Sequence, residues 1–177
     1  DFKDVGINFR KMDPKDLCLL VFHDAAWANA LSDELVDNPS DAQIEAKEVY
    51  SQIGYVTFIA EKSKIRQGLP SKANLVDWRS HACHRTCRST FAAETMSCSE
   101  AMEAGIAFRG AFLEALHPDL ELMDIDVELL PIISVTDCKS LYDTMHKDGN
   151  PKAPTERRLE VDLAALREIY QHEAGEV

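Results

Sequence analysis

Four carboxylates occupy positions from which they could share metal ions. Asp24 and Asp137 each come directly after an apolar run, and Glu94 and Asp162 lie within helical patterns. Sites in α/β sheets gather at the carboxyl ends of strands, so two strands that end in aspartate predict two carboxylates side by side. Carboxylates that close repel one another unless a cation lies between them, and hard oxygen ligands select Mg²⁺ or Mn²⁺.

Four converging acids could hold two ions. Two divalent ions about 3.5–4 Å apart activate a water and stabilise the leaving oxygen in phosphodiester cleavage. We therefore expect a two-ion Mg²⁺ or Mn²⁺ site whose metal ligands and catalytic residues are Asp24, Glu94, Asp137 and Asp162. Taken singly, each acid has a simpler explanation: an Asp after a strand is usually a turn former, a helical Glu is usually solvated, and Asp162 could form a surface ion pair.

Two buried strands must position the aspartates. Leu17–Phe22 (LCLLVF) is apolar without alternation and stops at His23-Asp24, and 131–136 (PIISVT) stops at Asp137. Such runs indicate strands buried on both faces, at the centre of a sheet. Ile53–Ala60 and the shorter Asn74–Arg79 are further strand candidates, separated by a basic loop at 62–72. Residues 40–49 could form a short capped helix.

The long helix predicted over Thr90–Leu116 must position Glu94. Its stripe of small and apolar residues carries one acid, Glu94, which needs a partner because burying a lone carboxylate is costly. Glu100 and Glu103 fall on the opposite side and are expected to be solvated. Ser140 opens a short helix, and a last helix follows from Thr155. Trp27 and Trp78 are interpreted as core or strand residues, His23 and Cys98 as core residues.

Five cysteines are an odd number for a disulfide framework, so a reducing, intracellular setting such as the cytoplasm or the nucleus is expected. Cys18 and Cys138 are expected to be buried thiols. The segment 81–87 (HACHRTC) suggests zinc, but one short cluster is poor evidence, and a basic loop is the preferred interpretation. Apolar runs are far too short for a membrane span, and no secretory leader is expected.

The net charge of −12 argues against a free-standing nucleic-acid binder, whose affinity comes largely from phosphate neutralisation. Basic residues nevertheless concentrate between Lys62 and Arg88, where Asp77 is the one acid. These could simply be solvated loop residues. The functional alternative is a patch that contacts a nucleic-acid backbone, with these candidates: Lys62, Lys64, Arg79, Arg85 and Arg88.

Six segments together resemble the ribonuclease H domain of copia-type retrotransposon polyproteins. They are 23–28 (HDAAWA), 54–58 (GYVTF), 78–80 (WRS), 88–95 (RSTFAAET), 136–141 (TDCKSL) and 157–162 (RRLEVD). The resemblance covers roughly residues 17–170, and its strength lies in the order of the motifs.

The resemblance implies an α/β ribonuclease H-like fold, with a mixed central sheet of three antiparallel strands followed by parallel strands, flanked by helices. Residues 1–16 would be a connector, and 17–177 a domain cut from a longer polyprotein. The resemblance also implies that the domain cleaves the RNA strand of RNA–DNA hybrids. The implied partner is a reverse transcriptase domain of the same polyprotein, and no association with a membrane is implied.

Some features depart from the family pattern. The segment 29–52 is longer than the usual connection, the sequence is expected to stop before the family's closing segment with its final strand, and Glu160 competes with Asp162 as the fourth acid. A non-catalytic module of the same fold within a larger assembly is the main alternative function. An exonuclease or integrase is less favoured, because integrase-like relatives carry the glutamate late in the chain. His146 lies where it could assist product release.

Overall fold

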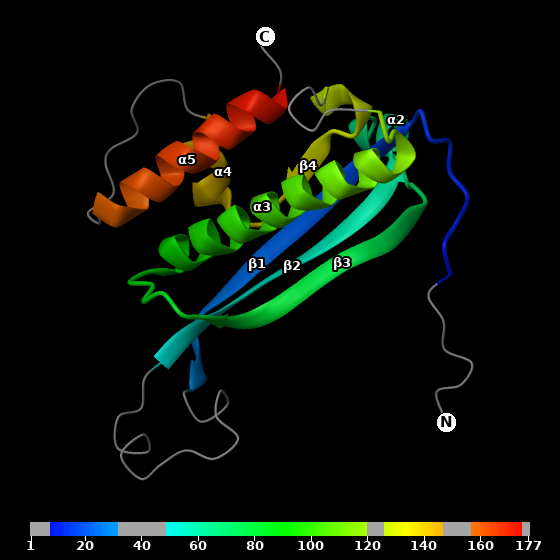
Figure 1. Ribbon diagram of the computed structural model, residues 1–177. Helices are drawn as coiled ribbons and strands as arrows, with labels where there is room; N and C mark the ends of the chain where they lie inside the picture. The colour runs from blue at the N-terminus through cyan, green and yellow to red at the C-terminus, as the bar shows by residue number, and fades with distance from the viewer. Residues whose placement is uncertain (1–7, 32–48, 120–125, 147–156, 175–177) are drawn as a thin grey trace, which may run out of the picture.

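The computed structural model describes residues 8–31, 49–119, 126–146 and 157–174. Its elements are β1 (Leu17–Leu31), β2 (Val49–Glu61), α2 (Lys62–Arg66), β3 (Ala73–Cys83), α3 (Thr90–Leu116), η3 (Val127–Leu129), β4 (Ile132–Val135), α4 (Lys139–His146) and α5 (Arg157–Ala174). Figure 1 shows them as an α/β arrangement in which α3 runs along the sheet and α5 lies beyond α3. The expected short helix at 40–49 and the expected start of the last helix at Thr155 fall outside the described residues.

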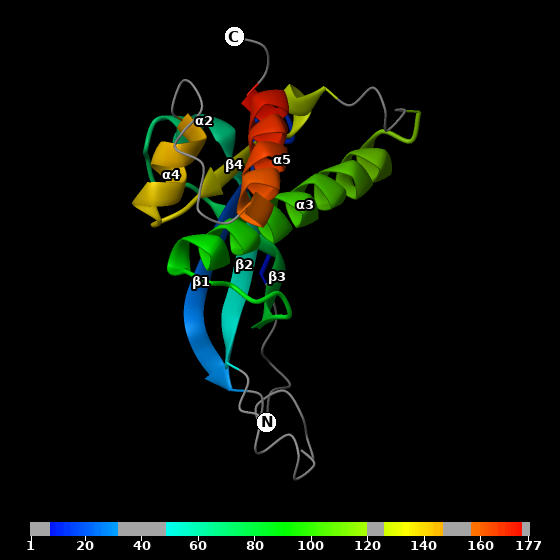
Figure 2. The ribbon, with the colours of Figure 1, turned by 90° about the vertical axis from the view of Figure 1, so that its left-hand side faces the viewer.

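The sheet is mixed and has the order β3-β2-β1-β4. β1 pairs antiparallel with β2, β2 pairs antiparallel with β3, and β1 pairs parallel with β4. This confirms the expected α/β class with three antiparallel strands, a parallel strand and flanking helices. It also places both apolar runs next to each other, since β1 is an inner strand between β2 and β4 (Figure 2).

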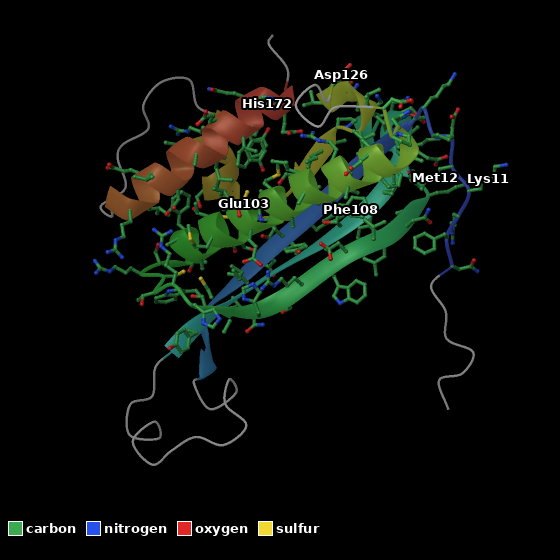
Figure 3. All side chains as sticks on the ribbon, in the orientation of Figure 1. Lys11, Met12, Glu103, Phe108, Asp126 and His172 are labelled. Carbon is green, nitrogen blue, oxygen red and sulfur yellow. The ribbon has the colours of Figure 1, made fainter. Side chains whose placement is uncertain are left out.

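The core lies between α3 and one face of the sheet. Leu19 and Val21 are fully buried there, and Met12 and Phe108, both labelled in Figure 3, are partly buried against the same cluster. A Cβ at Gly105 would lie 3.4 Å from Val21 Cγ2 and 3.5 Å from Ile132 Cδ1. These are ordinary van der Waals distances, so α3 packs directly on the side chains of β1 and β4 at this position.

A second cluster joins α3 to α4 and α5. Its buried members include Cys98 and Met102 of α3, Leu141 of α4, and Leu163 and Leu166 of α5. The burial of Cys98 confirms its assignment to the core. A buried ion pair adds to this contact, because Arg109 of α3 donates to Glu173 of α5 with an Nη2–Oε1 distance of 2.7 Å.

Several local predictions were wrong. β1 and β3 are longer than expected, and the first part of the predicted loop 62–72 is the short helix α2. Trp27 and Trp78 belong to strands, as one of the two expected alternatives had it, but they are 48% and 61% exposed and not core residues. Phe22 is 41% exposed, because it lies on the open face of the sheet opposite α3. Glu100 is not simply solvated, since it pairs with Arg79 and His81. Cys18 is buried as expected, whereas Cys138 is only half-buried.

Candidate metal centre

The strand register brings Asp24 and Asp137 together. In the parallel pair of β1 and β4, Phe22 lies opposite Val135. Asp24 and Asp137 each follow two residues later, at the same carboxyl edge of the sheet. Both side chains are exposed at that edge, so both remain accessible to an ion or a substrate.

Glu94 completes the group from the helix side. Ser89 caps α3 by accepting a hydrogen bond from the Ala92 N–H, which fixes the start of the helix and places Glu94 in its second turn. One carboxylate oxygen from each of Asp24, Glu94 and Asp137 lies within 4.8 Å of the others. The structure therefore unites three of the four acids that the sequence singled out.

The Glu94 carboxylate has the environment of an unused ligand. Glu94 is only 5% exposed, and its Oε2 has no hydrogen-bond partner in the described part of the chain. No described lysine or arginine lies within ion-pair distance of Asp24, Glu94 or Asp137. A buried acid beside two other acids, without a cationic partner, is an arrangement that a hard divalent cation would stabilise. The donor set thus suits Mg²⁺ or Mn²⁺.

The electrostatics of the triad support the same reading. Burial, together with the nearby charges of Asp24 and Asp137, raises the pKa of Glu94 to about 7, although a hydrogen bond from the Ala25 N–H opposes the shift. Burial and the two neighbouring charges favour the neutral acid in the metal-free protein, and they outweigh the hydrogen bond. A bound cation would reverse the balance by stabilising the carboxylate.

His23 lies behind the triad on the α3 face of β1. It is 5% exposed, and its Nε2 lies 3.2 Å from the Ser134 hydroxyl of β4. Burial lowers the pKa of His23 to about 4, against the opposing effects of Asp137 and Asp24. The imidazole is therefore neutral near pH 7. Its burial confirms that it packs in the interior.

Ser97 is a supporting residue that the sequence did not reveal. Its hydroxyl lies 2.8 Å from the carbonyl oxygen of Asp24 and 3.0 Å from that of Gly54. One turn after Glu94, it fastens α3 to both strands at the level of the site. A small polar residue three positions after the glutamate was the available signal, because on a helix it faces nearly the same direction.

An open cavity adjoins the two aspartates on the sheet face away from α3. It has a volume of about 530 Å³ and is lined by Phe22, Asp24, Gly54, Arg79 and Asp137, among others. A Cβ at Gly54 would lie 3.0 Å from the carbonyl oxygen of Arg79, so this position opposite Asp24 has no room for a side chain. The volume is within the ordinary range for sites that hold small organic groups.

Asp162 is not part of the triad. Its carboxylate pairs with Arg85, with 2.8 Å between Oδ2 and Nη2 and 3.0 Å between Oδ1 and Nη1. The pair lies beside Ala92 and Met96, about half a turn of α3 away from Glu94. The competing acid, Glu160, does not join the triad either. As it stands, the structure thus supports a three-carboxylate group and not the expected four.

The basic residues do not form one patch around the acids. Lys62 and Lys64 lie in α2, at the end of the sheet where β1 begins, and Lys62 pairs with Glu128. Arg79 pairs with Glu100, and Arg85 with Asp162. Arg88 is exposed just before the N-cap of α3 and has no ion pair with any described acid. Their contact with nucleic acid stays a prediction.

The remaining histidines give no second metal site. The triad is the one group of three or more potential ligands within the described ranges, so the zinc interpretation of 81–87 gains no support. His81 instead contacts Glu100 at 2.8 Å. His146, at the end of α4, is exposed and stacks on Tyr142 with ring centroids 4.1 Å apart.

Comparisons with protein-family models, curated proteins and solved structures gave no match. None of the helices described is both long and apolar enough to span a bilayer.

Proposed function

We propose that this protein is a metal-dependent endoribonuclease of the ribonuclease H type, which cleaves the RNA strand of RNA–DNA hybrids. The observation that carries the proposal is the convergence of Asp24, Glu94 and Asp137 within 4.8 Å at the carboxyl edge of two parallel strands. The resemblance to copia-type domains in six ordered segments supports the choice of RNA–DNA hybrids as substrate. The same resemblance supports a reverse transcriptase domain of the same polyprotein as the partner.

In this proposal, Asp24, Glu94 and Asp137 hold the divalent ion. When bound, Mg²⁺ or Mn²⁺ supplies a Lewis acid that activates water and neutralises charge at the phosphodiester. Asp24 and Asp137 are exposed and face the substrate side, whereas Glu94 is buried and anchors the group from below. Ser97 keeps the helix that carries Glu94 in register with Asp24. The products would carry 5′-phosphate and 3′-hydroxyl ends.

A second ion would need a fourth ligand. Asp162 can supply it only if its pair with Arg85 opens and α5 changes position, because Asp162 lies on the Met96 side of α3. Substrate binding, or docking of the partner domain, could drive that change through the arginine, which is itself suited to phosphate. We infer that the isolated protein binds its first ion through the triad alone.

The decisive experiment is cleavage of a labelled RNA–DNA hybrid with Mg²⁺ or Mn²⁺. We expect cuts in the RNA strand, none in a DNA duplex, and loss of activity in Asp137→Asn. Asp143→Asn is the matched control, because Asp143 forms a surface pair with Lys139 in α4 and should leave the rate unchanged. Equal inertness of the folded wild type and Asp137→Asn would contradict the proposal.

Hybrid binding can be tested separately from cleavage. Arg88→Glu should weaken binding and flatten its salt dependence, because one phosphate contact fewer releases fewer counterions. Lys64→Glu is a useful comparison, since α2 lies at the opposite end of β1 from Asp24. An unchanged salt slope in Arg88→Glu would remove Arg88 from the binding surface.

A non-catalytic module of the same fold is the second candidate. The net charge of −12 and the engagement of Asp162 with Arg85 both favour it, since an isolated acidic domain repels phosphates and the expected fourth acid, Asp162, is paired with an arginine. Folded protein that binds neither Mn²⁺ nor hybrid would support this function instead.

A further inference from the structure

Two cysteines lie next to each other where β3 leads into α3. Cys83 is the last residue of β3, and Cys87 lies in the connection that follows. Their sulfur atoms are 3.9 Å apart, with the Cys87 thiol donating a hydrogen bond to Cys83 Sγ. A disulfide has an S–S distance of about 2.05 Å, so the sulfurs would have to approach by roughly 2 Å.

The surrounding residues hold this pair in place. Cys83 is 4% exposed, packs with Ala25, Ile53 and Ala93, and lies opposite Ser51 in the sheet. Cys87 is half-buried against the same cluster, and its carbonyl oxygen accepts a hydrogen bond of 3.1 Å from Trp27 Nε1. The two thiols are therefore kept close by the fold, beyond what their sequence spacing alone imposes.

We propose that Cys83 and Cys87 form a redox modification site that closes into a disulfide on reaction with a hydroperoxide. This inference rests on the geometry of the pair and is independent of the proposed nuclease activity. It assigns a function to the segment 81–87, for which the sequence had suggested zinc or a basic loop.

The chemistry divides into two balanced steps. The Cys83 thiolate attacks one oxygen of the hydroperoxide, so an S–O bond forms, the O–O bond breaks, and the departing oxygen leaves as water or an alcohol after taking up a proton. Cys87 sulfur then attacks Cys83 sulfur, so the S–S bond forms and the S–O bond breaks. The hydroxide released takes up the Cys87 proton as water, and the hydroperoxide has accepted two electrons.

The acidities of four thiols agree with this assignment. The hydrogen bond from Cys87 lowers the pKa of Cys83 and raises that of Cys87. Burial instead raises the pKa of Cys18 and of Cys98 to about 11, which makes them poor nucleophiles at neutral pH. Cys138 is half-buried, and its Sγ lies 3.3 Å from the Ser140 hydroxyl.

Oxidation would also act on the loop between the cysteines. This loop carries Arg85, which holds Asp162, and the packing cluster includes Ala25 and Ala93, the neighbours of Asp24 and Glu94. Drawing Cys87 toward Cys83 would therefore move the loop that holds the Arg85–Asp162 ion pair beside the triad.

The test is to treat the folded protein with hydrogen peroxide at pH 7 and follow intact mass and thiol content. We expect a loss of two hydrogen masses and two thiols, with peptide mapping that links Cys83 to Cys87. The Cys83–Cys87 disulfide should form at least about tenfold faster in the folded protein than in the urea-unfolded chain, since unfolding removes the contact that stabilises the thiolate. Cys138→Ser should behave like wild type.

Two variants keep the proposal falsifiable. In Cys87→Ser, peroxide should leave a sulfenic acid on Cys83 that dimedone traps, whereas Cys87 in Cys83→Ser should react slowly. Oxygen addition at Cys83 in the wild type without a linked peptide would overturn the proposal. So would a disulfide that involves Cys138, or equal rates in folded and unfolded protein.

Discussion

The Ser97 hydroxyl of α3 lies 2.8 Å from the backbone carbonyl oxygen of Asp24 in β1. The same hydroxyl lies 3.0 Å from the carbonyl oxygen of Gly54 in β2, so its one proton is shared between two strands. Because Ser97 is 1% exposed, water cannot replace it as a donor without rearrangement. This contact links the helix of Glu94 to the strand of Asp24.

Ser97→Ala should therefore affect both folding and metal binding. We expect the free energy of unfolding to fall by about 1–3 kcal/mol, because buried carbonyl oxygens lose their donor. Mn²⁺ affinity should fall as well, because α3 loses its register with β1. Urea denaturation and calorimetric titration measure the two effects. Ser99→Ala, at a half-buried position of the same helix, is the control, and equal losses in both variants would show that the Ser97 contact has no special role.

The three triad acids should differ from Asp162 in metal binding. Asp137→Asn should weaken Mn²⁺ binding by at least about tenfold, because removing one ligand from a hard-cation site costs roughly 1.4 kcal/mol or more. Asp162→Asn should leave the first ion within a few-fold of wild type, since that carboxylate is paired with Arg85. Electron paramagnetic resonance of Mn²⁺ provides the stoichiometry. Loss of the first ion in Asp162→Asn would show that α5 brings Asp162 to the triad.

The raised pKa of Glu94 predicts a pH dependence of stability in the metal-free protein. A folded pKa of about 7 above an ordinary value of 4.5 means that the folded state binds the proton more tightly. Stability from this group is therefore fully present below pH 4.5 and is lost as pH rises through about 7. The pKa shift corresponds to a change of about 3 kcal/mol in the free energy of unfolding.

Glu94→Gln isolates this contribution. The variant should match wild type near pH 4 and be more stable by about 3 kcal/mol at pH 8 without metal. His23 has the opposite dependence, because its lowered pKa removes stability as pH falls from 6.5 to about 4, but it is present in both proteins. Saturating Mn²⁺ at pH 8 should stabilise wild type more than Glu94→Gln. A pH-independent difference between the proteins would disprove the shift.

The stability of the protein should depend on keeping or replacing the buried residues Arg109 and Glu173 together, and not on their charges as such. Their side chains are 6% and 5% exposed, so removing one partner leaves an uncompensated buried charge. Arg109→Met and Glu173→Leu should each destabilise by about 3–5 kcal/mol, whereas the double variant should recover much of that loss. Chemical denaturation of the four proteins completes the cycle. Additive losses would mean that the two groups act independently.

Much of the fold could be predicted from local pattern. The continuous apolar runs before Asp24 and Asp137 predicted two strands, and β1 and β4 are neighbours in the sheet. The expected burial of both strands on both faces was wrong, because β4 ends the sheet in the described part of the chain and Phe22 of β1 lies on an open face. The helix over Thr90–Leu116 was predicted at its observed bounds, since a serine cap and an uninterrupted helical stretch define it locally. Three of four site acids followed from these elements.

Tertiary structure alone decided the rest. The sequence set the order of Asp24, Glu94 and Asp137, but only the parallel register of Phe22 with Val135 and the packing of α3 against β1 bring their oxygens together. Asp162 was assigned to the metal site by the order of the motifs. Its partner in the structure, Arg85, depends on how α5 is oriented against α3, which no local pattern encodes. The contacts of Ser97 and the Cys83–Cys87 pair have the same origin, because each depends on the packing of segments that the sequence places in separate elements.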